Sequence, residues 1–340
     1  MAVEQQDRRK ERLDRGIKVR SDGVYAISSW LEMSYLVAPR LLFIVGLLVA
    51  PIFLLPLPYW QKVLSIICIY SLLAISFDFL ANYVGLVSLG GGFYIGVGAY
   101  VAALLNMKWG MPIFVTIPAA TLFGAAICTV VFLPCLPLRG VYFAIVSLMF
   151  PLLAARIIEA LDIFGGTDGI VGVDGFSSVW MEQYVLILAV LAAVFVLRRM
   201  ITEDVGLVFS GVKDNDQAVK ASGINITRYK ALGIFIASSL GCFGGAVLSH
   251  IYMWAGISQF ALDFSIIPIA ATVIGGGGTL IGPVIGCLIL VPVSELLRDF
   301  GTLRIAVYAI ILTLFIVYKS EGIMVFASRK YEQFERWVSI

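Results

Sequence analysis

The sequence predicts an all-α, polytopic membrane protein with about ten transmembrane helices, some of them broken by glycine, and with both termini in the cytoplasm. The first reason is composition, because 60% of the 340 residues are hydrophobic and 14% are charged, whereas soluble domains are about 45–50% apolar. The second is that nearly uncharged runs of about 18 residues or more, long enough to cross a bilayer, recur along the chain. Because these runs are continuous, they predict helices and not the alternating segments of a β-barrel.

The apolar runs place the spans along the chain. Six are expected first, at about residues 40–58, 63–81, 86–106, 112–134, 141–160 and 182–198. A seventh follows at about 231–254. The next apolar stretch, 264–297, is too long for one crossing and has GGGGTLIGP in its middle, so two short or broken helices are predicted there. A last span at about 303–318 brings the total to ten.

The distribution of lysine and arginine predicts the orientation. These residues gather in the tail before the first span, in the segment 198–230 and in the C-terminal tail, and cytoplasmic loops of membrane proteins hold such an excess. With both ends inside, the number of crossings is even, which agrees with ten. The loop FGGTDGIVGVDGFSSVW, residues 164–180, then lies on the outer face.

Five parts of the chain are therefore expected. They are a cytoplasmic tail that ends in a helix lying in the membrane interface, with Trp30 and Tyr35 at headgroup depth (1–36), the first transmembrane helices (37–198), a cytoplasmic loop (199–229), the remaining transmembrane helices (230–319) and a second cytoplasmic tail (320–340).

Several functions are disfavoured by the composition. The net charge of +2 is too small to suggest nucleic acid as a partner. The cysteines lie in apolar runs without CxxC spacing, which predicts buried structural thiols and not disulfides or metal ligands: Cys68, Cys128, Cys135, Cys242 and Cys287. With a single histidine, neither a metal cluster nor a catalytic set can be assembled, so we expect no metal and no enzyme activity in this chain.

The polar segment 199–229 predicts a small element outside the membrane. Asp214 or Asp216 can cap the start of a helix, DQAVKAS runs for about two turns, and Gly223 stands where a C-terminal residue of positive φ belongs. A solvated connector is the plain alternative. Because a connector needs only a few residues, this longer segment suggests a docking surface.

Glycine is concentrated in two apolar stretches, ANYVGLVSLGGGFYIGVGAYVAALL (81–105) and GGGGTLIGP (275–283). In a helix interior each glycine costs about 0.5–1 kcal/mol relative to alanine. Two explanations remain open: glycines let helix backbones pack closely in lipid, or they break a helix beside a transport pathway. GGGGTLIGP is not followed by Gly-Lys-Ser/Thr, so it is not a nucleotide site.

Ionisable residues inside spans are functional candidates because burying a charge in lipid is expensive. Asp78 is the main candidate, although a position at the inner interface is equally compatible with its place in the sequence. Arg156 and Glu159 are spaced to pair on one helix, Glu295 and Arg298 can reach the interface, and His250 is expected to be an interfacial histidine and not a proton relay.

Four motifs, in order across about residues 80–290, resemble those of the branched-chain amino-acid permease family of ABC importers, on its LivM-like side. QAVKASG, residues 217–223, has the spacing of the E-A-A-x-x-x-G coupling motif, and VKDNDQAVKASGINITRYKAL resembles the surrounding loop. GLVSLGGGFYIGVGAY is similar to the family's GLxSLGxxxxxGxGAY, and VIGGGGTLIGPVIG to its VxGGxGSxxGPxxG. GGTDGI in the outer loop is the fourth motif.

The resemblance implies a ten-helix permease subunit in the inner (plasma) membrane of a bacterium or archaeon. It would form, with a second permease subunit in a heterodimer, the path for a small solute such as a branched-chain amino acid or a related compound. Two cytoplasmic ATPase subunits would bind ATP and Mg, an extracytoplasmic binding protein would deliver solute, and this chain would bind no cofactor itself. Leu207 and Ser210 stand where the family commonly has arginines.

The same resemblance assigns roles to residues. ATPase coupling falls to Asp214, Gln217, Ala218, Val219 and Gly223. The pathway or gate falls to Ser88, Gly90, Gly91, Gly92, Tyr94, Gly275, Gly276, Gly278 and Pro283, and the outer loop to Gly165, Gly166, Asp168 and Gly169. The main alternative function is a stand-alone ion-coupled secondary transporter or channel, which would depend on Asp78. A non-transporting membrane assembly subunit is a weaker one.

Overall fold

The computed structural model describes residues 30–138, 140–297, 310, 313 and 322–326, with side chains from residue 41 onward. Helix α2, Trp30–Phe53, begins about ten residues before the span predicted at 40–58. The end of the predicted interfacial helix and the first span therefore form one continuous helix, which corrects that boundary. All but two residues of the last predicted span, 303–318, and most of the tails 1–36 and 320–340 lie outside the described residues.

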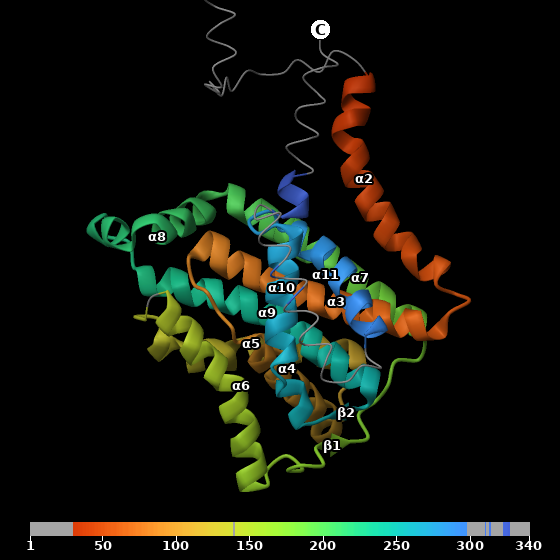
Figure 1. The fold of residues 1–340 in the computed structure, drawn as a ribbon. Coiled ribbons are helices and arrows are strands. Elements are labelled where there is room, and N and C mark those ends of the chain that lie inside the picture. The colour runs from red at the N-terminus through yellow and green to blue at the C-terminus, as the bar shows by residue number, and fades with distance from the viewer. Residues whose placement is uncertain (1–29, 139, 298–309, 311–312, 314–321, 327–340) are drawn as a thin grey trace, which may run out of the picture. The chain divides into compact units, whose positions relative to one another are not determined.

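Helices make up nearly all of the remaining described chain (Figure 1). They are α3 (Pro58–Phe79), α4 (Gly91–Trp109), α5 (Ile113–Phe132), α6 (Val141–Leu161), α7 (Val179–Thr202), α8 (Asp204–Ala221), α9 (Ile226–Tyr252), α10 (Asp263–Gly275) and α11 (Gly282–Leu296). A π-helical segment, η1 (Leu80–Val84), prolongs α3, and short 3-10 helices follow α5 (η2, Leu133–Cys135) and precede α10 (η3, Ile257–Phe260). The prediction of an all-α fold is confirmed.

Six helical segments among the described residues are long and apolar enough to cross a membrane. They are Pro58–Val84, Ile113–Cys135, Val141–Leu161, Val179–Thr202, Ile226–Tyr252 and Ile257–Gly275. Helix α4 is not among the six, and α11 belongs with the shorter apolar helices. The chain is thus a multi-span helical protein, whereas the total of ten crossings stays a prediction.

The two glycine stretches interrupt helices, as one of the two explanations predicts. The helix expected at 86–106 starts only at Gly91, because the chain leaves η1 through Gly85, whose φ is +79°, and stays non-helical through Gly90. The stretch 264–297 divides into α10 and α11 at residues 276–281, as predicted. We call residues 276–281 the α10–α11 turn.

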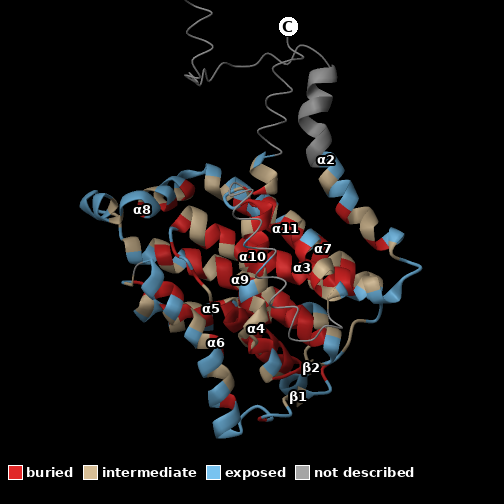
Figure 2. Ribbon diagram, in the orientation of Figure 1, coloured by how far each residue is buried: buried red, intermediate tan, exposed pale blue. Residues whose placement is uncertain are grey.

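Burial is concentrated in α3, α4 and α9 (Figure 2). In the most apolar 18-residue stretch of α3 and its π-helical extension, 89% of the residues are buried. The corresponding share is 33% in α5 and its 3-10 extension, and 28% in α6 and in α7. Helix α9 packs against α3, α4 and α5, and α10 packs against α11 and α3. Among the described residues, α5, α6 and α7 are therefore much more exposed than α3.

Close backbone approach, the second explanation for the glycines, is also confirmed at particular positions. A Cβ on Gly98 of α4 would overlap the backbone of Cys242 in α9, and one on Gly286 of α11 would overlap the carbonyl of Ala271 in α10. In lipid, association of helices depends on such van der Waals contact between backbones. The packing of these helix pairs therefore requires glycine.

A two-stranded antiparallel sheet is the one departure from helix among the described elements. Strand β1 (Ile170–Val171) pairs with β2 (Trp254–Ala255), with Ile170 opposite Ala255. This sheet holds the loop between α6 and α7 against the connection between α9 and η3.

Candidate functional site

The α10–α11 turn is held by the carboxylate of Asp78. Asp78 is fully buried, and its Oδ1 accepts a hydrogen bond from the backbone N–H of Gly278 at 2.6 Å. Its Oδ2 accepts from the N–H of Leu280 at 3.2 Å, and the side chain of Asn82, one turn further along, donates to Oδ1 at 2.7 Å. A buried carboxylate is tolerated when it is hydrogen-bonded. The structure therefore places the Asp78 side chain in the protein interior, whereas its depth relative to the membrane interface stays a prediction.

The α10–α11 turn makes a second contact with η1 and caps its own helix. The hydroxyl of Tyr83 donates to the carbonyl of Gly278 at 2.6 Å. Gly278 has a φ of +80°, a conformation that other residues rarely adopt. The side chain of Thr279 accepts from the N–H of Gly282 at 2.9 Å, and Pro283 occupies the first turn of α11, where its missing N–H costs nothing.

Helix α8 contacts the other side of η1. The ammonium of Lys213 donates to the backbone carbonyl of Asn82 at 2.8 Å. A Cβ on Gly85 would come within 2.9 Å of the Cα of Lys213, so the chain leaving η1 lies directly against α8. The buried ring of Phe209, in the first half of α8, meets the ring of Phe79 edge to face with centroids 5.6 Å apart.

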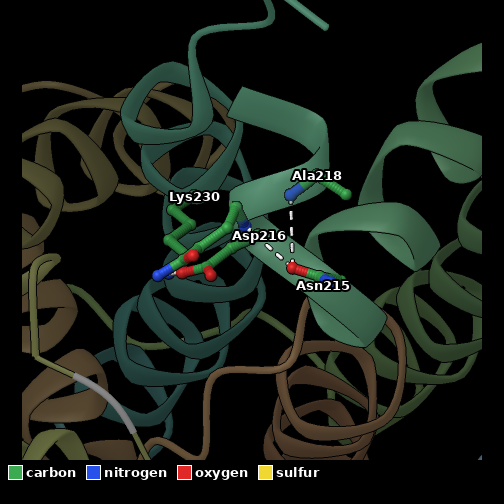
Figure 3. Close-up of polar contacts among 5 residues, drawn as sticks. Asn215, Asp216, Ala218 and Lys230 are labelled. Atoms are coloured by element: carbon green, nitrogen blue, oxygen red, sulfur yellow. Dashed lines mark hydrogen bonds and ion pairs between the residues drawn. The ribbon is translucent and has the colours of Figure 1, made fainter. Parts of the chain in front are cut away.

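Asn215 divides α8 into two helical parts. Its φ of −154° and ψ of 94° are extended, and its Oδ1 accepts from the N–H groups of Gln217 at 3.1 Å and Ala218 at 3.2 Å (Figure 3). Asn215 is therefore the cap of the second part, and the prediction that Asp214 or Asp216 would cap it was wrong. The reason is geometric, because an extended residue immediately before the helix directs its side chain at the free N–H groups of the first turn.

The residues predicted to couple to an ATPase lie in and next to the second part of α8. Asp214, Gln217, Ala218 and Gly223 are exposed, whereas Val219 is half-buried and lies beside Gly211. The φ of Gly223 is +80°, which confirms its predicted role at the end of the helix. The sequence predicted neither the helical first part of α8, 204–214, nor its anchoring by Lys213. The buried pair Phe209 and Val212, spaced by three, is the signal that could have indicated it.

An ion pair joins the second part of α8 to α9. The ammonium of Lys230 lies 3.8 Å from the carboxylate of Asp216, and the two side chains are 10% and 19% exposed (Figure 3). Because Lys230 stands in the first turns of α9, the pair ties the exposed helical part to a membrane-spanning helix. The role of Lys230 was not foreseen from the sequence.

The predicted pathway residues fall in two places. Ser88, Gly91 and Tyr94 line a small recess together with residues of α3 and α10 that include Ser76, Ser265 and Pro268. Gly92 donates its N–H to Ser265 Oγ at 3.0 Å, and Gly90 packs on the ring of Phe132, so this group lies beside the start of α10.

The second group, Gly275, Gly276, Gly278 and Pro283, lies at the other end of α10 and does not line that recess. The structure therefore gathers the first group around the start of α10, and it places the second group in and beside the α10–α11 turn. Their roles in a pathway or gate stay a prediction.

The loop predicted to lie on the outer face is held tightly against β2. The backbone of Gly165 and that of Gly169 are in close contact, and the ring N–H of Trp254 donates to the carbonyl of Asp168 at 2.8 Å. Gly169 lies against the carbonyl of Ala255, while a Cβ on Gly166 would overlap the side chain of Asp162. The predicted loop residues therefore shape a fixed surface.

A polar cluster that the sequence did not indicate fastens the end of the same loop. The N–H of Asp174 donates to Asn106 Oδ1 at 2.9 Å, and the Asn106 amide donates to Asp174 Oδ2 at 2.8 Å. His250 Nδ1 lies 2.7 Å from the carbonyl of Asp174. His250 is fully buried in the last turn of α9, next to the loop residue Asp174, and its predicted depth at the membrane interface stays a prediction.

The other charged pairs and the cysteines that the sequence analysis named can also be located. Arg156 and Glu159 form the predicted pair at 2.6 Å on α6, and Tyr59 donates to Glu295, while Arg298 lies outside the described residues. All five cysteines are free thiols, and all but Cys135 are buried. Within the described residues no three His, Cys, Asp or Glu side chains gather as a metal site.

Comparison with known proteins gives one consistent result. Residues 59–318 match the family model described as the permease component of branched-chain amino acid transport systems. Over 287 residues the chain is 25% identical to the high-affinity branched-chain amino acid transport system permease protein LivM of Salmonella typhimurium and to that of Escherichia coli, covering 75% of this chain and 68% of each relative. No solved structure matches the chain.

A more distant relative is the probable branched-chain amino acid transport permease protein LivM of Methanocaldococcus jannaschii, which is 24% identical over 223 residues, 62% of this chain and 65% of the relative. The relatives are permease subunits and not enzymes, and the described helices make the chain a multi-pass membrane protein. Since the family model covers most of the sequence, the chain belongs to the branched-chain amino acid transport permease family.

Proposed function

We propose that this chain is the permease subunit of an ABC importer that moves a small solute, such as a branched-chain amino acid or a related compound, across the inner membrane. The observation that carries the proposal is the second part of α8. It is capped by Asn215, ended by Gly223, tied to α9 by Lys230, and exposes Gln217 and Ala218 outside the membrane-spanning helices. A short, fixed helix with small exposed residues suits docking into a groove of a separate subunit.

In this proposal the chain crosses the membrane ten times and both termini are cytoplasmic. Helix α8 is then on the inner side, and the loop that contains Gly165, Gly166, Asp168 and Gly169 faces outward. That loop is held against β2 by Trp254, so it offers a preformed surface to an extracytoplasmic binding protein. The excess of lysine and arginine in the three polar segments supports this orientation.

The partners divide the work of transport. A second permease subunit forms the solute path together with this chain, and the partly exposed faces of α5, α6 and α7 supply apolar surface for lipid and for that subunit. Two cytoplasmic ATPases bind ATP and Mg, and this chain binds no cofactor. Closure of the ATPases displaces α8, and the spans tilt between outward and inward access.

Substitution of Gly223 tests the proposal directly. Gly223→Glu should abolish ATP-dependent leucine uptake in membrane vesicles that hold the native complex, while insertion into the membrane is kept, because the side chain projects from the docking end of α8. Gly110→Glu is the matched control. Gly110 also ends a helix with positive φ and also has open space at its Cβ, but it lies at the far end of α4. Unchanged uptake in Gly223→Glu would remove the assignment.

The alternative of an ion-coupled transporter or channel predicts uptake without ATP and without the ATPases. It needs an acidic residue that exchanges ions or protons, and the fully buried Asp78 is its main candidate. Because three N–H groups already donate to that carboxylate, the contacts favour an anchor over an ion carrier. Leucine uptake by the purified chain alone in liposomes, driven by an imposed proton or sodium gradient, would support this alternative.

A further inference from the structure

A continuous set of hydrogen bonds connects α8 with the α10–α11 turn. Lys213 of α8 holds the carbonyl of Asn82, and the side chain of Asn82 donates to Asp78. Asp78 accepts the N–H groups of Gly278 and Leu280. Lys213 and the turn are therefore connected through Asn82, whose backbone carbonyl accepts from Lys213 and whose side chain donates to Asp78. We call Lys213, Asn82 and Asp78 the anchor chain.

The hydrogen bonds between Asp78 and the α10–α11 turn join a carboxylate to backbone N–H groups. The N–H groups of Gly278 and Leu280 lie beyond the end of α10 and have no carbonyl of a preceding helical turn to accept them. A carboxylate that accepts backbone N–H groups forms hydrogen bonds about twice as strong as neutral ones. Loss of that acceptor would leave the N–H of buried Leu280 unpaired, which is costly.

A π-helical turn lies between the two ends of the anchor chain. Residues 80–84 form a single π-helical turn, a rare geometry often found at functional sites. The chain then runs non-helically from Gly85 to Gly90 before α4 starts. A displacement of α8 therefore reaches η1 through Lys213 without having to bend a regular helix.

We infer that Asp78 is a positioning residue for transport: it fastens the α10–α11 turn to η1, and Lys213 fastens η1 to α8, so that movement of α8 is delivered to the α10–α11 pair. This inference rests on the proposed function, since α8 moves only if a motor acts on it. The role of the buried Asp78 carboxylate is then to hold the α10–α11 turn in place by hydrogen bonds, and not to carry an ion.

Hydrogen exchange tests the connection without any transport measurement. The full chain in lipid nanodiscs is exchanged into D₂O, and the peptide that covers residues 276–281 is followed by mass spectrometry. Asp78→Asn should raise its exchange rate about tenfold. Lys213→Met keeps the packing of the stem but removes the donor, and it should raise exchange about threefold although Lys213 does not touch the turn.

Three variants serve as controls for the exchange experiment. Lys213→Arg retains a donor and should restore the wild-type rate. Glu182→Gln neutralises another buried carboxyl, on α7, and Lys108→Ala removes an exposed lysine at the end of α4, so both should leave the turn unchanged. Exchange of the turn that stays at the wild-type rate in Lys213→Met overturns the inference.

The second experiment measures leucine uptake and ATP hydrolysis by the native complex in proteoliposomes. In Lys213→Met and Asp78→Asn, hydrolysis should continue while the leucine moved per ATP falls about tenfold, with recovery in Lys213→Arg. Hydrolysis and uptake that fall together, with no change in their ratio, would reduce the anchor chain to a stabilising role and overturn the inference. Wild-type complex that moves no leucine contradicts the proposed function instead, and the exchange result then still decides the connection.

Discussion

Lys230 and Asp216 form an ion pair, 3.8 Å apart, between the first turns of α9 and the exposed helical part of α8. Both side chains are mostly shielded from water, at 10% and 19% exposure, so screening by solvent is weaker than at an open surface. The pair links two elements that are consecutive in the chain. It ties the second part of α8 to the start of α9.

This pair can be measured by a double-mutant cycle. We expect Lys230→Met and Asp216→Asn to be non-additive in thermal unfolding of the detergent-solubilised chain, with a coupling energy of about 1 kcal/mol. Arg228→Met and Asp214→Asn provide a matched cycle of exposed charges in the same two segments. Strict additivity in the Lys230–Asp216 cycle would show that the two charges do not interact.

The cap at Asn215 makes a second prediction. Asn215→Ala removes the acceptor for the N–H groups of Gln217 and Ala218 and should destabilise the second part of α8 by about 1 kcal/mol. Hydrogen exchange of residues 217–221 should become correspondingly faster. Asp214→Ala should leave that exchange unchanged, and Asn215→Asp should preserve it. If Asp214→Ala has the larger effect, the cap has been assigned to the wrong residue.

Close packing at Gly98 makes a third prediction. Gly98→Ala places a methyl group against the backbone of Cys242, which cannot move without shifting α9, and should lower stability by about 1–3 kcal/mol. Gly46→Ala is the control, because nothing lies within 4 Å of its Cβ position in another apolar helix. The check is the melting temperature of each variant in detergent, and equal values would mean that α4 and α9 pack less closely than described.

The cluster around Asn106 makes a fourth prediction. Asn106→Leu keeps the volume but removes the partner of the Asp174 N–H and carboxylate, so the loop 165–175 should loosen and be cleaved faster by protease added to solubilised chain. The cost is about 1–3 kcal/mol. Asp168→Asn retains the backbone carbonyl that Trp254 uses and should be cleaved at the wild-type rate. Equal cleavage of the two variants would remove Asn106 from the fastening of the loop.

The spans were predictable because their evidence is local. Most of the helices lie close to their predicted ranges, as α6 does at Val141–Leu161, since a run of apolar residues must be helical wherever lipid surrounds it. The division of 264–297 at its glycines and the ending of α8 at Gly223 followed from neighbours in sequence. The start of α4 was missed because the π-helical turn and the non-helical residues after it are as apolar as a helix.

Helical class, family motifs and the segments outside the membrane could be recognised from composition and spacing alone, because each depends on residues close together in the chain. Tertiary folding decided the rest. Asp78 contacts Gly278 across 200 residues, and Lys213 contacts Asn82 across 131. No periodicity encodes such pairs, because they exist only after separate helices have packed. The burial of Asp78 and its contacts with the α10–α11 turn were therefore decided by the tertiary fold.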